Sequence, residues 1–247
     1  MSDEIRLGAD AGVATIEINR PHKKNALSTS MYDCMTAALE AFDADPGIGA
    51  VILRGGADFT AGNDLLDFMS ADITDFAGAP PLRYLFALQA FSKPIIAAVS
   101  GVAIGIGTTM LLHADFVFAG ESATFALPFV KIGLVPEGAA TLLLPLAAGL
   151  GRARRYLLTG ETFDAATALE LGIVGEVTAD GDLQAFAREQ AAALAALPAH
   201  AVRETKRLLR APLREAIAST LLAEAQAFGA CLQTQAFRTA AERLIRG

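Results

Sequence analysis

Two glycine-containing turns and one isolated glutamate are the parts of this sequence best suited to chemistry. Residues 59–64 read Phe-Thr-Ala-Gly-Asn-Asp and residues 103–109 read Ala-Ile-Gly-Ile-Gly-Thr-Thr, and each turn follows an apolar, strand-like run. Such a turn can present a backbone N–H to a ligand oxygen. Glu137 follows Pro136 in an otherwise apolar segment. Because two N–H donors stabilise an oxyanion and a carboxylate can remove the proton whose loss creates it, the pattern predicts an enolate-forming site.

Each of these features also has a structural explanation. Glu137 could merely lie in the first turn of a helix, where a carboxylate is favourable by roughly 0.3–1 kcal/mol. Gly105 and Gly107 could serve close packing between a helix and a strand. We expect Asp64 to cap the helix that follows it, and His113 to be a packed core histidine rather than a ligand. Burial would raise the pKa of Glu137 and a helix N-terminus would lower it, so the sequence leaves the direction open.

Length and composition favour a globular enzyme with a large core. The chain has 247 residues, of which 53% are hydrophobic, and a formal net charge of -7. This charge argues against a nucleic-acid partner, because phosphate binding needs a concentrated basic surface. Cys34 and Cys231 are isolated and the histidines are scattered, so neither a disulfide framework nor a metal site is expected. We therefore expect a reducing, cytoplasmic location and no metal ion.

One uncharged run raises the question of a membrane span. Residues 95–112 contain no charged side chain, and this run approaches the length of about 17–25 residues that a spanning helix needs. Gly101, Gly105 and Gly107 interrupt the run, and residues 95–99 have the apolar character of a buried strand. The first residues of the chain are acidic and lack the basic and apolar regions of a signal peptide. We therefore expect no membrane partner.

Strand-like and helical segments alternate over the first two thirds of the chain. Residues 12–19 alternate apolar and polar side chains, as a half-buried strand does. Ser28 is a suitable N-cap for the helix that follows it. Further strands are expected at residues 50–53, 95–99 and 115–119, and further helices at residues 82–91 and 108–113. This alternation predicts an α/β fold with mostly parallel strand pairing.

The last part of the chain carries helical periodicity without a convincing strand. The expected helices cover residues 186–197, 202–209, 213–228 and 236–245. We therefore divide the chain into an α/β core with the ligand site over residues 1–182 and a helical C-terminal region over residues 183–247. Apolar helical faces outside a main core commonly pack against another subunit, so we expect this region to form an oligomer.

Ordered segments along the chain resemble the crotonase superfamily, which comprises enoyl-CoA hydratases and isomerases. They are Asn19-Arg20-Pro21 with Asn25-Ala26-Leu27, the turns at residues 61–64 and 105–107, the segment around Pro136, Gly160-Glu161, and residues 168–174. The resemblance implies a crotonase-like spiral of ββα turns, a helical C-terminal trimerisation region, an acyl-CoA thioester as ligand, and a homotrimer or dimer of trimers. It also implies an oxyanion hole made by the backbone N–H groups of Asn63 and Ile106. The residues implied to line the substrate or CoA site are Lys23, Ala61, Gly62, Asp64, Leu65, Gly105, Thr109, Phe129 and Pro136.

Two positions depart from the hydratase pattern. A hydratase of this superfamily carries glutamates at the positions that hold Thr109 and Phe129 here. Addition of water needs a base and an acid, so the loss of both groups argues against hydration. Glu137, in the segment Gly-Leu-Val-Pro-Glu-Gly, resembles instead the glutamate of peroxisomal-type Δ3,Δ2-enoyl-CoA isomerases, which also share the Gly-Asn-Asp turn seen at residues 62–64.

The resulting expectation is an isomerase that converts 3-enoyl-CoA to trans-2-enoyl-CoA in fatty-acid β-oxidation. Glu137 alone would carry the proton from C2 to C4 while the oxyanion hole stabilises the dienolate. Coenzyme A is part of the substrate, so no separate cofactor is expected. Two alternatives stay open. One is other crotonase-type acyl-CoA chemistry, such as hydrolysis or decarboxylation, and the other is a non-catalytic acyl-CoA-binding scaffold, which would have no need of a carboxylate at Glu137.

Overall fold

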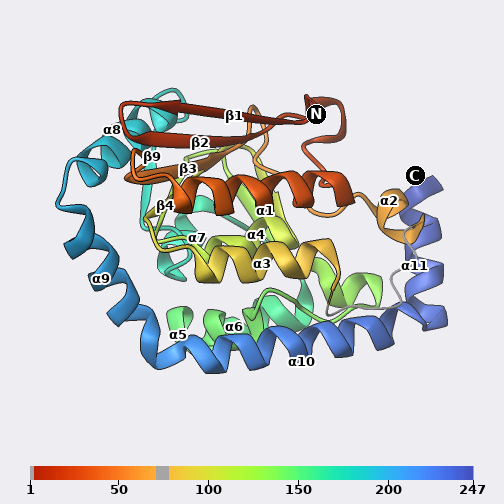
Figure 1. Cartoon of the computed structure of the whole chain (residues 1–247). Helices are drawn as coiled ribbons and strands as arrows, with labels where there is room; N and C mark the ends of the chain where they lie inside the picture. Colours follow the sequence, from red (N-terminus) through yellow and green to blue (C-terminus); the bar gives the residue numbers. More distant parts are fainter. Residues whose placement is uncertain (1–2, 71–77, 247) are drawn as a thin grey trace.

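The computed structural model describes residues 3–70 and 78–246, and strands alternate with helices over most of this chain (Figure 1). A six-stranded sheet has the order β1-β2-β3-β4-β6-β9. β1 pairs antiparallel with β2, and the pairs that follow across the sheet are parallel. The strands are β1 (Ile5–Asp10), β2 (Val13–Ile18), β3 (Ala50–Arg54), β4 (Ile95–Val99), β6 (Phe116–Gly120) and β9 (Glu176–Thr178). The predicted α/β fold with mostly parallel pairing is confirmed.

Short strands form a second sheet beside the first. Its order is β5-β7-β8, with β5 parallel to β7 and β7 antiparallel to β8. The strands are β5 (Val102–Ile104), β7 (Thr124–Ala126) and β8 (Thr162–Asp164). Because β5 follows β4 after a turn at Ser100 and Gly101, the two sheets are joined where the second glycine turn begins.

Strand β4, in the middle of the main sheet, is buried on both of its faces. Alternate residues of a strand point to opposite faces. Ile95, Ala97 and Val99 belong to the main hydrophobic core, whereas Ile96 and Ala98 belong to a second cluster. Helix α8 (Leu183–Ala195) supplies the other side of that second cluster through Leu183, Ala187 and Ala191. The first helix of the expected C-terminal region therefore packs on the sheet.

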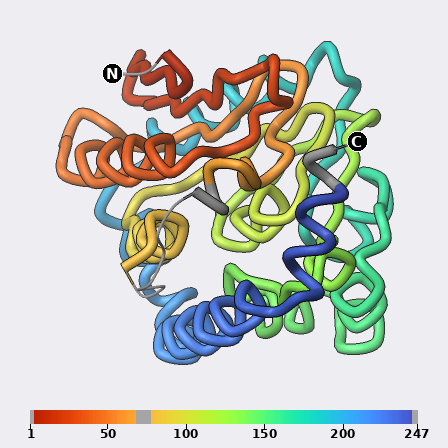
Figure 2. Tube along the Cα trace, turned by 90° about the vertical axis from the view of Figure 1, so that its right-hand side faces the viewer, coloured from red at the N-terminus to blue at the C-terminus, as the bar shows by residue number. Residues whose placement is uncertain are grey.

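Helices α1 (Thr29–Ala44) and α3 (Pro80–Ala90) lie side by side on the other face of the sheet (Figure 1). From α9 (Ala199–Arg210), the chain continues into the long helix α10 (Arg214–Leu232), which passes along α3 and α5 (Ala140–Ala148). Figure 2 shows the last helix, α11 (Gln235–Arg246), rising from the end of α10 beside α2 (Leu65–Ser70). The remaining α-helices are α4 (Ile106–Thr109), α6 (Leu150–Thr159) and α7 (Ala165–Glu170), and the 3-10 segments are Pro21–Lys23, Met110–His113, Pro128–Ile132 and Ala211–Leu213.

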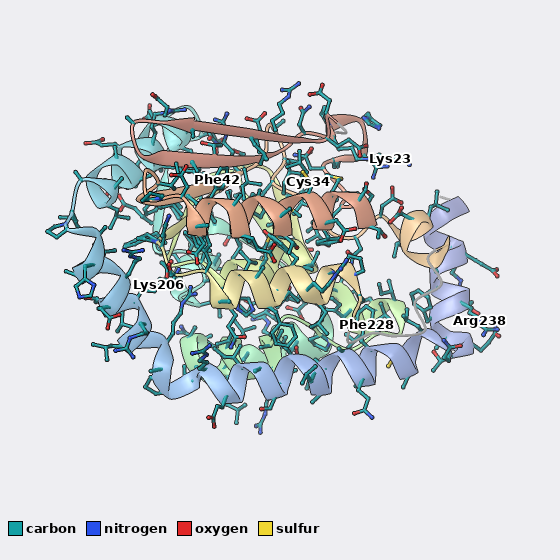
Figure 3. All side chains as sticks on the ribbon, viewed as in Figure 1. Lys23, Cys34, Phe42, Lys206, Phe228 and Arg238 are labelled. Carbon is teal, nitrogen blue, oxygen red and sulfur yellow. The ribbon has the colours of Figure 1, made fainter. Side chains whose placement is uncertain are left out.

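A partly buried carboxylate ties α9 to the sheet. Asp115 Oδ2 accepts a hydrogen bond from the backbone N–H of Ile95 at 2.8 Å and from Lys206 Nζ at 2.7 Å. Its other oxygen, Oδ1, accepts from Arg210 Nη2 at 3.0 Å. Figure 3 shows Lys206 pointing from α9 toward the body of the molecule. These bonds attach helix α9 to the sheet.

The uncharged run at residues 95–112 forms β4, β5, α4 and part of a 3-10 segment. The helix expected at residues 108–113 begins earlier, at Ile106, and continues as 3-10 helix from Met110. Within residues 3–70 and 78–246, no helix is long and apolar enough to cross a membrane.

Candidate active site

Glu137 lies in the segment between the 3-10 turn Pro128–Ile132 and helix α5. Its side chain is partly buried, and its Oε1 accepts a hydrogen bond from Thr109 Oγ1 at 2.5 Å. Thr109 is fully buried at the end of α4. The backbone at Gly138 also lies close to the Thr109 side chain, because a Cβ at Gly138 would lie 2.8 Å from Thr109 Oγ1. Glycine at position 138 therefore lets the Glu137 segment approach α4.

Burial raises the pKa of Glu137 to about 8. The hydrogen bond from Thr109 opposes this shift, and the nearby carboxylate of Glu224 adds to it. Desolvation penalises the charged form of a carboxyl group, and a like charge does the same. The sequence leaves the direction of the pKa shift of Glu137 open, and in the structure burial dominates. Glu137 lies before the first turn of α5, because this helix begins at Ala140.

Glu137 opens onto a small, mainly apolar cavity that Asn63 also lines. Helix α3 contributes one wall and helix α10 another. Figure 3 shows Phe228 on α10, on the side of that helix that faces α3. The other lining residues are Ala79, Pro81, Leu82, Leu85, Gly138, Leu221, Ala225 and Phe228. The cavity thus places a carboxyl group against mainly apolar walls.

The two glycine turns lie next to each other. Thr60 N–H donates to the carbonyl oxygen of Val102 at 2.9 Å, and Ile104 N–H donates to that of Thr60 at 3.0 Å. A Cβ at Gly62 would lie only 2.7 Å from the carbonyl oxygen of Ile104. Gly105 has φ 59° and ψ -121°, a conformation that glycine adopts without the steric cost of a side chain. Both turns therefore require their glycines for backbone geometry.

Two backbone donors at these turns make no hydrogen bond to any described residue. On either side of Asn63, the chain pairs with Leu27, whose N–H donates to Gly62 and whose carbonyl accepts from Asp64. The N–H of Asn63 itself takes no part in these bonds, and neither does that of Ile106, the first residue of α4. Ile106 is buried and Asn63 is half-buried. Because buried backbone donors are nearly always paired, these two N–H groups are candidates for binding a ligand oxygen.

Sequence reasoning missed Tyr32, which holds Asn63 in place. Tyr32 lies on α1 and is 1% exposed, and its Oη donates to Asn63 Oδ1 at 2.5 Å. Burial raises the pKa of Tyr32 well above its ordinary value, so the hydroxyl stays a donor. A tyrosine beside the apolar face of a helix needs a partner for its hydroxyl, and this was the available signal.

The structure confirms the structural roles expected for Asp64 and His113. Asp64 Oδ1 accepts from the N–H of Leu66 at 3.1 Å at the start of α2, and Asp64 Oδ2 accepts from Arg20 Nη1 at 2.7 Å. His113 is buried, and its Nε2 donates to the carbonyl oxygen of Gly138 at 2.8 Å. Burial lowers the pKa of His113 to about 4, so the ring is neutral.

Other residues implied by the resemblance lie around the turns without lining the cavity. Lys23 is exposed in the 3-10 turn Pro21–Lys23 and is seen near the surface in Figure 3. The ring of Phe129 lies 3.9 Å from where a Cβ of Gly105 would be. Ala61 donates its N–H to the carbonyl oxygen of Lys24. Leu65 begins α2, and Pro136 is buried beside Glu137.

Known proteins are similar to this chain over nearly its whole length. The family model described as enoyl-CoA hydratase/isomerase matches residues 8–245. The chain is 32% identical to "Probable enoyl-CoA hydratase echA8" of Mycobacterium bovis, over 94% of this chain and 91% of that protein. It is 34% identical to human enoyl-CoA delta isomerase 2, over 84% of this chain and 54% of that protein. The solved structure of Pseudomonas aeruginosa OdaA is similar with a TM-score of 0.96 and 36% identity, covering 100% of each chain.

The fold expected from the resemblance is confirmed by this structural similarity and by the helices that end the chain. Relatives that span nearly the full length share more than 30% of their residues with it. The chain therefore belongs to the enoyl-CoA hydratase/isomerase family.

Proposed function

We propose that this protein is a Δ3,Δ2-enoyl-CoA isomerase, which converts 3-enoyl-CoA to trans-2-enoyl-CoA in fatty-acid β-oxidation. The observation that carries the proposal is the carboxyl group of Glu137 at an apolar cavity, with Thr109 and Phe129 at the positions of the hydratase glutamates. Hydration needs one group to activate water and another to protonate carbon, whereas isomerisation needs a single group that removes and returns a proton. The relatives include proteins named for each reaction, so the proposal depends on the site.

The isomerisation balances with one acid–base group. The Glu137 carboxylate removes a proton from C2, and the electrons of the C2–H bond move toward the thioester oxygen to give a dienolate. The Glu137 carboxylic acid then returns the proton to C4, and the double bond ends between C2 and C3. A pKa of about 8 makes Glu137 a stronger base than an ordinary carboxylate, which suits removal of a weakly acidic proton.

Thr109 orients the proposed base. Its hydroxyl donates to Glu137 Oε1, and Glu137 Oε2 accepts no hydrogen bond from the described residues. Oε2 is therefore the oxygen that we assign to proton transfer. The cavity wall formed by α3 and α10 would hold the acyl chain beside it.

The N–H groups of Asn63 and Ile106 are proposed to bind the thioester oxygen. One such donor typically contributes about 2.7–4 kcal/mol to catalysis, because it stabilises the charge that develops there. Tyr32 restrains Asn63 through its side chain, which limits movement of one donor. Lys23, exposed near the same turns, is a candidate partner for the CoA phosphates.

The test is an assay of both reactions with purified protein. A panel of 3-enoyl-CoA thioesters of graded acyl length should be converted to trans-2-enoyl-CoA much faster than trans-2-enoyl-CoA is hydrated. Glu137→Gln keeps the shape of the side chain but cannot accept the C2 proton. We expect this variant to lose roughly 10²–10⁴-fold in turnover, since that is the usual contribution of a positioned general base.

The matched control is Glu121→Gln, the same substitution at an exposed residue outside the cavity. It should leave turnover unchanged, and both variants should bind a product acyl-CoA as the parent protein does. Faster hydration than isomerisation, or near-parental turnover by Glu137→Gln, would contradict the proposal. Release of free CoA without isomerisation would indicate a hydrolase, and release of carbon dioxide from a carboxylated acyl-CoA would indicate a decarboxylase. Acyl-CoA binding without turnover would indicate a scaffold.

A further inference from the structure

Helix α5 begins without a capping side chain of its own. Its N-cap residue is Ala139, which has no side-chain acceptor for the free N–H groups of the first turn. Glu224, on α10, takes this role from a distant part of the chain. Glu224 Oε2 accepts from Ala139 N–H at 2.6 Å, and Glu224 Oε1 accepts from Thr141 N–H at 2.9 Å and Thr141 Oγ1 at 2.5 Å. Both oxygens of the buried Glu224 carboxyl group thus accept hydrogen bonds from the first turn of α5.

The backbone that Glu224 holds follows Glu137 directly. Gly138 has φ 73° and Ala139 has φ 56°, so two successive residues are left-handed. This conformation costs roughly 1–2 kcal/mol for a residue with a side chain, such as alanine. His113 donates to the carbonyl oxygen of Gly138, while Glu224 accepts the N–H of Ala139. The single peptide unit between Gly138 and Ala139 is therefore held from both of its sides.

We propose that Glu224 is a positioning residue for Glu137: by holding the left-handed turn at Gly138 and Ala139, it keeps the Glu137 carboxyl group against Thr109 and at the cavity. This inference rests on the proposed function, because it assigns Glu224 a role in proton transfer through Glu137. Rotation of the held peptide unit would break its bonds to Glu224 and His113 together and would swing the Glu137 side chain away from Thr109.

Glu224 also acts on Glu137 through its charge. Burial raises the pKa of Glu224, and the hydrogen bonds from Thr141 and Ala139 oppose this shift by favouring the ionised form. A negative charge at Glu224 disfavours the carboxylate of Glu137 and contributes to the raised pKa of that group. Tyr32 and Tyr84 have pKa values raised by burial and His113 is neutral, so none of the three adds a charge at neutral pH. Among the described residues, the titratable groups that act on Glu137 are Glu224 of α10 and Tyr32 of α1, and His113 bonds the residue that follows it.

The test compares Glu224→Gln with the parent protein over pH 5–10, using isomerase activity, affinity for a product acyl-CoA, and melting temperature. Glutamine keeps the size of the side chain but removes the charge and one acceptor oxygen. We expect kcat to fall by roughly 10–10²-fold, as a small misplacement of a catalytic group does. Product affinity should be little changed. The pH at which kcat/KM reaches half its maximum should move to lower pH, because the like charge near Glu137 is gone.

Asp115→Asn is the matched control. Asp115 is also a partly buried carboxyl group that anchors a C-terminal helix, but it bonds Ile95, Lys206 and Arg210 rather than the Glu137 segment. Its substitution should lower the melting temperature and leave the pH profile in place. If Glu224→Gln does the same, Glu224 is only a helix cap and the inference is overturned. Full activity of Glu137→Gln, measured alongside, would instead reject the proposed function itself.

Discussion

At the residue scale, Thr109 contacts the carboxyl group that we propose as the base. The resemblance implies that Thr109 lines the substrate site. It also implies that a hydratase carries a glutamate at this position, so the threonine argues against hydration. In the structure, the Thr109 hydroxyl donates a hydrogen bond to Glu137 Oε1, and Thr109 does not line the cavity. A hydroxyl at this position thus replaces a second acid–base group with a hydrogen bond that steadies the first.

Thr109→Val should shift the pH dependence of the reaction to higher pH. The bond from Thr109 lowers the pKa of Glu137, so its loss leaves burial unopposed. A hydrogen bond to a charged group contributes about 1.5–3 kcal/mol and one pKa unit is 1.36 kcal/mol, so we expect a rise of about one unit or more. Activity measured from pH 6 to pH 10 should show a loss near pH 7 that is partly recovered above pH 9.

Thr108→Val is the control for that substitution. Thr108 is the neighbouring buried threonine, and its hydroxyl bonds the carbonyl oxygens of Ala103 and Ala126 instead of Glu137. It should lower stability without moving the pH profile. Identical profiles for Thr109→Val and the parent protein would show that the bond does not tune Glu137.

Glu137→Gln should also alter how stability depends on pH. The pKa of Glu137 is about 8 in the folded protein, against an ordinary value of 4.5. Between these values the folded state retains a proton that the unfolded state has lost, so the free energy of unfolding falls as pH rises across this window. Glutamine does not titrate and is spared this fall. The melting temperature of the variant minus that of the parent protein should therefore increase from pH 5 to pH 9. Each 1 kcal/mol of difference in the free energy of unfolding corresponds to about 2–4 °C.

Differential scanning calorimetry at pH 5, 7 and 9 measures this difference. Titratable groups that do not interact with Glu137 are common to both proteins, so their contributions cancel in the comparison. Glu224 interacts with Glu137, so its contribution is part of the measured difference. Parallel melting curves across the range would contradict the raised pKa of Glu137.

At the scale of the elements, the sequence predicted those with a clear apolar pattern. Strand β4 lies exactly where the apolar run at residues 95–99 placed it, and α1 begins after Ser28 as expected. β1, β9 and the strands of the second sheet were missed. β5, β7 and β8 have three residues each, which is too short to establish an alternating pattern. Helix α5 contains Pro145, and because proline normally disfavours a helix interior, the sequence does not indicate that this helix continues to Ala148.

The same limit explains which parts of the candidate site were predicted. The turns and Glu137 stand out because glycine, proline and an isolated charge are visible locally in the sequence. The residues that support them do not, because Tyr32 reaches Asn63 across 31 positions and Glu224 reaches Ala139 across 85. His113 was expected to be packed, but its bond to Gly138 depends on the fold. The division of the chain at residue 183 stays a prediction, although α8 packs on the sheet.

At the scale of the whole molecule, we expect a homotrimer or a dimer of trimers. Several leucines of the C-terminal helices and the segment before α9 are exposed in the single chain, and removing their apolar surface from water favours association. Light scattering at micromolar concentration should report three or six subunits, and Leu209→Glu should lower that number. A monomer under these conditions would reject the prediction. The exposed leucines are Leu197 at 50%, Leu208 at 60%, Leu209 at 74% and Leu222 at 48%.

Helix α10 links two properties that an engineer would wish to change separately. Leu221, Ala225 and Phe228 line the apolar cavity, and Glu224 leaves the same helix between them to hold the turn after Glu137. A one-residue insertion or deletion within α10 would rotate the following residues by about 100° and displace the cavity wall or Glu224. Acyl-chain preference can therefore be redesigned by exchanging side chains at the cavity, whereas changes in the length or register of α10 would alter proton transfer as well.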